Sequence, residues 1–184
     1  RQAGKGQRSR AAAPVIRLSR MTIDTPRLEI RLLSAEQLPL WLGDLPRLEQ
    51  ELNGTYRAEP LTGVFRTIVE GQLAAVAADP ANPQWHSFWF ILRKTDRSVI
   101  GSAVFKDGPD SGGRIEIGYG LGRAFEGHGY MTEAVEALCG WALRQPGVRR
   151  VTAETDADGI ASQRLLQRCG FRELSRGETV WWIR

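Results

Sequence analysis

The 184-residue sequence has few of the side chains that build metal sites and disulfide frameworks. It contains only two cysteines and two histidines. Cys139 and Cys169 form no CxxC pair, and the histidines stand alone at 86 and 128, so no zinc-ligand spacing is present. These absences predict a protein without a metal centre. They also favour a reduced, cytoplasmic location.

Long apolar runs are also missing. No stretch approaches the roughly 18 consecutive apolar residues of a membrane-spanning helix, and neither a repeat nor an internal linker interrupts the chain. The composition, 42% hydrophobic and 25% charged, is that of an ordinary globular protein. The length suits one domain with a full core, and we expect no membrane partner.

Acidic residues are absent from the first 20 positions, which carry six of the 25 basic side chains. The remaining 164 residues therefore hold 19 basic and 21 acidic side chains, a net charge of −2. A nucleic-acid-binding face is not expected on such a domain. Residues 1–20 predict a basic disordered tail, or an extension upstream of a natural start at Met21. A nucleic-acid arm or a targeting signal is the alternative.

Apolar periodicity predicts alternating strands and helices in the rest of the chain. Ser34 is expected to cap a helical region that Pro39 and Pro46 divide. A stripe formed by Met131, Ala134, Val135, Leu138 and Ala142 predicts a helix, and Gly170 ends another. The expected strands are 27–33, 87–92, 99–106, 114–121, 149–155 and 179–184, and the other expected helices are 64–78 and 160–169.

The most informative segment is 115–138, IEIGYGLGRAFEGHGYMTEAVEAL, in which an apolar strand enters a glycine-rich turn and then an amphipathic helix. Gly127 and Gly129 allow a phosphate to approach the backbone closely. The free N–H groups and the dipole of the following helix add positive potential there. The turn therefore predicts a site for a phosphorylated ligand.

Two common phosphate-binding motifs do not fit this turn. A P-loop starting at Gly122 would need Lys and a hydroxyl residue where His128 and Gly129 stand. A Rossmann GxGxxG fingerprint would need a third glycine at Phe125 or Thr132. The sequence therefore predicts neither a P-loop site for a nucleoside triphosphate nor a dinucleotide-binding Rossmann fold.

What remains, xxxGxGYxTEA after a strand that contains Glu, closely resembles motif A of the GNAT acetyltransferases, whose turn holds the pyrophosphate of acetyl-CoA. Segments 23–33 (IDTPRLEIRLL), 98–106 (SVIGSAVFK) and 156–171 (DADGIASQRLLQRCGF) are similar to further motifs of the RimJ/RimL-like branch. The resemblance implies one α/β (α+β) domain over residues 21–184. Its central sheet would be mixed and mostly antiparallel, with splayed central strands and flanking helices.

The resemblance also implies the residues that contact acetyl-CoA. Pantetheine would lie between the splayed strands against the backbone around Tyr119, and glycines at 118, 120 and 122 fit a close ligand approach, or alternatively a bulge. Glu133 is expected to serve the helix start rather than catalysis. The implied contacts are Tyr119, Gly120, Leu121, Ala124, Gly127, His128, Gly129, Tyr130, Met131, Gly159 and Ser162.

Amide formation needs a base for the amine and a donor for the leaving thiolate. Glu116, between two isoleucines in a central strand, is the candidate base, because a carboxylate there is costly without a role or a partner. A structural ion pair with Arg114 or a neighbouring strand is the alternative. For the acid, many GNAT enzymes use a Tyr at the position of Leu166.

Ser162 is therefore the candidate acid, since it matches the Ser of the NxxS motif, with an ordinary surface serine as the alternative. The Asn of that motif is replaced by Gly159, which removes an expected pantetheine contact. Trp41, Tyr56 and Arg57 lie in the region that covers the acceptor groove in relatives. They would either select the acceptor or simply pack.

These features predict an acetyl-CoA-dependent N-acetyltransferase that acts on a primary amine, either a protein N-terminus or a small molecule. The alternative is a non-catalytic acyl-CoA-binding regulatory module, which Gly159 and Leu166 make credible. We expect no metal, no nucleic-acid or membrane partner, and a monomer or a homodimer.

A truncation tests the interpretation of the first 20 residues. Because they contain little apolar surface and no acid to pair with their charges, starting the chain at Met21 should leave the melting temperature and CoA affinity unchanged. A large drop in melting temperature would show instead that the segment packs on the domain.

Overall fold

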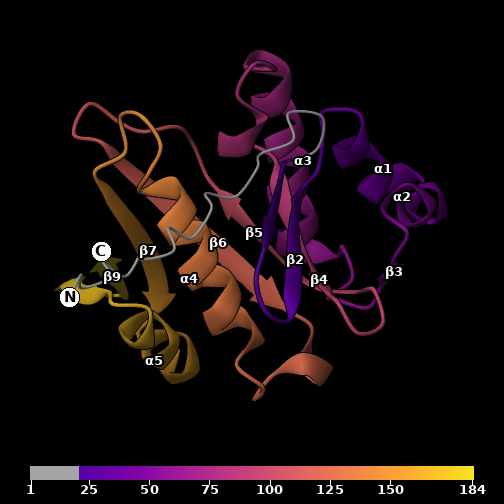
Figure 1. Cartoon of the computed structure of the whole chain (residues 1–184). Helices are drawn as coiled ribbons and strands as arrows, with labels where there is room; N and C mark the ends of the chain where they lie inside the picture. Colours follow the sequence, from indigo (N-terminus) through magenta and orange to yellow (C-terminus); the bar gives the residue numbers. More distant parts are fainter. Residues whose placement is uncertain (1–20) are drawn as a thin grey trace, which may run out of the picture.

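The computed structural model describes residues 21–184 (Figure 1). The predictions made for residues 1–20 lie outside the described residues. The described chain forms one sheet of nine strands with helices on both faces. The elements are β1 (Thr22–Asp24), β2 (Leu28–Leu32), α1 (Gln37–Gly43), α2 (Leu45–Leu52), β3 (Thr55–Tyr56), α3 (Gly63–Ala78), β4 (Phe88–Arg93), β5 (Ser98–Phe105), β6 (Arg114–Leu121), α4 (Tyr130–Ala142), β7 (Arg150–Asp156), α5 (Ile160–Arg168), β8 (Arg172–Arg176) and β9 (Thr179–Ile183), with short 3₁₀ turns at Pro83–Trp85 and Arg123–Phe125.

The strand order in the sheet is β1-β2-β4-β5-β6-β7-β9-β8, and β3 pairs with β5. Only the β6–β7 and β3–β5 pairs are parallel. β6 and β7 pair over three residues, Arg114–Glu116 against Arg150–Thr152, and then separate. The predicted mixed, mostly antiparallel sheet with splayed central strands and flanking helices is confirmed.

Two hydrophobic clusters hold the helices to the sheet. The predicted stripe of α4 is buried in full against β5, β6 and β7, on the face that Figure 1 shows in front. On the opposite face, α1, α2 and α3 bury Trp41, Leu48 and Val69 against β4 and β5. Burial of these stripes is the main favourable term that fixes the sheet between two helix layers.

Several predicted boundaries are confirmed, but one prediction about proline is wrong. The Ser34 hydroxyl accepts the Gln37 N–H at 3.1 Å, as a cap does, and Gly170 has the left-handed φ of +81° expected after a helix. Pro39 does not divide the helical region, since it lies in the first turn of α1, where its missing N–H has no helical acceptor. The division falls at Asp44, before Pro46 at the start of α2.

Trp85, Trp89 and Trp182 are buried in the core. Both cysteines are free and buried. Among residues 21–184, no helix has the length and apolar character needed to cross a bilayer.

Candidate functional site

The gap between β6 and β7 exposes strand backbone. The Lys106 N–H donates to the Glu116 carbonyl, and the Gly122 N–H donates to the Ile100 carbonyl. Because hydrogen-bonding direction alternates along an antiparallel strand, the backbone groups of Ile117, Tyr119 and Leu121 point away from β5. β7 pairs with β6 only as far as Glu116↔Thr152, so the Tyr119 and Leu121 groups lie beyond the ladder. These groups therefore face the wedge, which begins where the Thr152 hydroxyl donates to the Ile115 carbonyl at 3.1 Å.

The predicted phosphate turn lies at the open end of this wedge. Gly127 and Gly129 have φ values of +79° and +77°, and Gly129 directly precedes α4. Residues other than glycine rarely adopt these left-handed φ values. A cavity of about 810 Å³ joins the wedge to the start of α4. Its lining is Tyr119, Gly120, Leu121, Glu126, Gly127, Gly129, Tyr130, Met131, Thr132, Ala161, Ser162, Leu165 and Arg168.

Eight of the eleven residues predicted to contact the cofactor line this cavity, and three do not. Ala124 is exposed in the 3₁₀ turn before the glycines. The His128 ring lies against its own loop, with Nδ1 2.9 Å from the Glu126 carbonyl. Gly159 stands at the start of α5 and has no side chain to cap it.

A second cavity, of about 480 Å³, opens on the other side of β6. Its walls include the aromatic side chains of Tyr56, Phe65 and Phe88. Tyr119 and Gly120 line both cavities, so both cavities border this point of β6. Of the other predicted acceptor residues, Trp41 is buried in the core and Arg57 is exposed.

A short hydrogen bond joins two residues that line the larger cavity. The Tyr119 hydroxyl is 2.6 Å from Ser162 Oγ, and burial raises the pKa of Tyr119 to about 12. The phenol therefore stays protonated at neutral pH and can donate a proton or hydrogen bond. Leu166, at the position where the family resemblance leads us to expect a tyrosine, is fully buried.

Glu116 forms an ion pair with Lys106, which directly follows β5. A structural ion pair with a neighbouring strand is the alternative to a role as base, and Lys106 is such a partner. The Glu116 side chain is 23% exposed, and that of Lys106 is 50% exposed. Lys106 also borders the 480 Å³ cavity, whereas Glu116 lines an adjoining open cavity of about 520 Å³. Glu116 shares its sheet face with Gly118 and Gly120. Because these two glycines have no side chains, no β6 side chain on this face stands between Glu116 and the backbone at Gly120.

Sequence reasoning missed Arg168 and Lys106. Arg168 follows Ser162 by six residues, which is about 120° around α5, so helical periodicity from Ser162 gave no signal for it. Lys106 borders the site through the pairing of β5 with β6, which the sequence did not specify. Among residues 21–184, no group of three His, Cys, Asp or Glu side chains is arranged to hold a metal.

Comparisons with known proteins agree with this geometry. The family model described as acetyltransferase (GNAT) domain matches residues 21–172. The chain is 36% identical over 83 residues to the uncharacterized N-acetyltransferase YjdG of Bacillus subtilis, an alignment that covers 45% of this chain and 49% of that protein. The chain thus spans about half the length of the curated relatives it matches.

Solved structures share the fold. A RimL ribosomal L7/L12 alpha-N-protein acetyltransferase in complex with coenzyme A superposes with a TM-score of 0.62 at 18% identity, over 89% of this chain and 97% of that one. A ribosomal-protein-S5-alanine acetyltransferase from Vibrio fischeri gives 0.65 at 15% identity, over 89% and 96%. At such identities the likeness establishes the fold alone.

Proposed function

Because the chain belongs to the acetyltransferase (GNAT) domain family, we propose that it transfers the acetyl group of acetyl-CoA directly to a primary amine. The observation that carries the proposal is that two cavities share Tyr119 and Gly120 in their walls. One cavity ends in a phosphate-type turn, and the other is apolar and open to solvent. Donor and acceptor can therefore approach the same point of β6 from opposite sides.

The residues present fit acetyl-CoA. The left-handed glycines leave the turn free of side chains, and the start of α4 offers backbone donors to a pyrophosphate. The backbone groups of Tyr119 and Leu121, which lie beyond the last β6–β7 pair, suit the amides of pantetheine. Arg168 adds a positive charge at the cavity wall. Acetyl-CoA supplies the activated thioester.

Glu116 serves as the base. The amine nitrogen forms a bond to the acetyl carbon, the carbon–sulfur bond breaks, and the proton lost by the amine passes to the Glu116 carboxylate. From Glu116 to Gly120 the strand extends about 13 Å, so the proton travels through water in the open cavities. This use of water matches the role that the family resemblance implies for a glutamate on this strand.

Ser162, supported by the Tyr119 hydroxyl, donates a hydrogen bond to the leaving thiolate, which takes up its proton from water. Ser162→Ala should lower kcat by roughly tenfold, because a thiolate is a good leaving group and water can replace the hydroxyl. CoA affinity should change little. Initial rates of thiol release from acetyl-CoA measure the effect. A loss of three orders of magnitude would make Ser162 more than an assisting donor.

The acceptor is a protein N-terminus or a small primary amine. Ribosomal-protein acetyltransferases among the structural neighbours favour the first class, and the aromatic cavity beside Lys106 accommodates either. A panel of primary amines and N-terminal peptides, each incubated with acetyl-CoA and monitored for free thiol, tests the proposal. Turnover with any amine supports transfer. CoA binding without turnover on the whole panel would support the regulatory binding module.

A further inference from the structure

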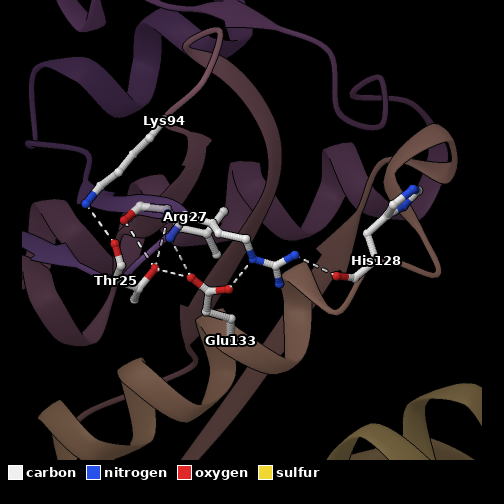
Figure 2. A network of polar contacts seen from close by, with 6 residues as sticks. Thr25, Arg27, Lys94, His128 and Glu133 are labelled. Atoms are coloured by element: carbon white, nitrogen blue, oxygen red, sulfur yellow. Dashed lines mark hydrogen bonds and ion pairs between the residues drawn. The ribbon is translucent and has the colours of Figure 1, made fainter.

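An arginine of the β1–β2 hairpin hydrogen-bonds to the backbone of the phosphate turn without lining the 810 Å³ cavity. Arg27, between β1 and β2, donates through Nε to Glu133 of α4 at 2.6 Å and through Nη1 to the His128 carbonyl at 2.8 Å. Figure 2 shows its guanidinium lying between these two acceptors. It also lies over the Tyr130 ring, 4.4 Å from the centroid. The guanidinium is thus held by three groups.

Glu133 is fixed in turn by the same hairpin. Its Oε1 accepts the Thr25 hydroxyl at 2.7 Å and the Arg27 backbone N–H at 2.9 Å (Figure 2). These bonds and the Arg27 charge lower the pKa of Glu133 although partial burial opposes them. A carboxylate near an anion site would repel the anion. Pairing with Arg27 offsets that negative charge beside the turn.

The bond to the His128 carbonyl has a consequence for the next amide. The described chain contains no cis peptide bond, so the His128 C=O and the Gly129 N–H of the same peptide plane point in opposite directions. The carbonyl points out of the turn toward Arg27. Gly129 lines the cavity, and within residues 21–184 no protein acceptor takes its N–H.

Without the hydrogen bond from Arg27, the plane of the His128–Gly129 peptide could flip. A flip of the plane changes φ of the following residue by about 180°, and glycine at Gly129 tolerates φ of either sign. The flipped plane would present the His128 carbonyl to the cavity and would turn the Gly129 donor away. Arg27 does not itself line the cavity, so its influence is exerted on the backbone and not on a ligand.

We propose that Arg27 is a positioning residue that locks the His128–Gly129 peptide with its N–H toward the cofactor's pyrophosphate. The inference rests on the proposed function, since it assumes that CoA occupies this cavity. It assigns a role in cofactor binding to the first hairpin, whose sequence lies about a hundred residues before the turn.

The test compares Arg27→Lys with Lys94→Met. A lysine keeps the positive charge but lacks the forked donors that reach Glu133 and the carbonyl together. Lys94 fastens the same hairpin, through the Thr25 carbonyl at 2.7 Å and an ion pair with Asp24, without touching the turn. Calorimetric titration with CoA should give an affinity roughly tenfold weaker for Arg27→Lys and nearly unchanged for Lys94→Met.

Amide NMR supplies a readout of the peptide itself. The Gly129 amide resonance should shift strongly on CoA addition in the wild type and in Lys94→Met, but not in Arg27→Lys. The inference is overturned if Arg27→Lys binds CoA and shifts this resonance like the wild type, or if Lys94→Met is equally impaired. Arg27→Gln serves as the second variant if the lysine variant does not fold.

Failure of the proposed function would be seen separately. If the folded wild type does not bind CoA, the cofactor assignment fails. The peptide orientation is then read without ligand from the nuclear Overhauser effect between His128 Hα and the Gly129 amide, which depends on the plane. A change of this effect in Arg27→Lys supports the lock, and an identical effect in both proteins overturns it.

Discussion

Glu116→Gln is expected to lower kcat by roughly two to four orders of magnitude while leaving CoA affinity almost unchanged. Glutamine keeps the shape of the side chain but cannot accept the proton of the attacking amine. Glu116 does not line the 810 Å³ cavity in which we propose that CoA binds, so CoA affinity should be retained. Raising the pH should partly restore the rate, because more of the amine is then already deprotonated. Thiol-release rates across pH on a verified acceptor measure both effects.

The ion pair with Lys106 provides the matched control. If Glu116 only anchors Lys106, Lys106→Met should reduce kcat as much as Glu116→Gln does, because each change removes the same contact. If Glu116 is the base, Lys106→Met should cost far less, since the carboxylate is retained. The two variants should differ little in stability, as a partly exposed pair is worth about 0 to 1 kcal/mol. Equal rates for wild type and Glu116→Gln at neutral pH would make Glu116 structural.

Gly129→Asp is expected to weaken CoA binding by at least tenfold, or about 1.4 kcal/mol. Gly129 has a φ of +77° and lines the cavity beside the free N–H groups of α4. An aspartate there would be strained. It would also bring a negative charge beside the turn, within reach of Arg27, where it would compete for that guanidinium and oppose anion binding. Calorimetric titration of CoA into the folded variant measures the loss.

Gly129→Ala separates strain from charge. A Cβ at this position would meet only Arg27 Nη2 at 3.5 Å, an ordinary contact. Alanine therefore carries the backbone penalty without the charge, and it should weaken CoA binding less than aspartate does. Unchanged CoA affinity in a folded Gly129→Asp protein would remove the cofactor assignment.

Most elements could be predicted because an apolar stripe that must be buried leaves a periodic pattern. The α4 stripe and helix 64–78 are confirmed on this ground. β8 was missed, since every residue of RELSR is exposed and no alternation marks it. β3 has only two residues, too few for a pattern. Pro39 misled because proline is tolerated in the first turn of a helix.

The candidate site also has parts that could be predicted from the sequence and parts that could not. The glycine turn is contiguous, so its geometry follows from local sequence. The Tyr119–Ser162 bond joins residues 43 positions apart, and the Arg27–His128 bond spans 101, distances over which local patterns say nothing. The Lys106–Glu116 pair depends on strand register, because a slip of one residue between β5 and β6 would place the two side chains on opposite faces.

Calorimetric titration of the full 184-residue chain with acetyl-CoA tests the central claim most directly. The wedge between β6 and β7, with the glycine turn at its end, predicts saturable one-to-one binding with a micromolar Kd. The absence of binding at millimolar acetyl-CoA, in protein shown to be folded by circular dichroism, would contradict it.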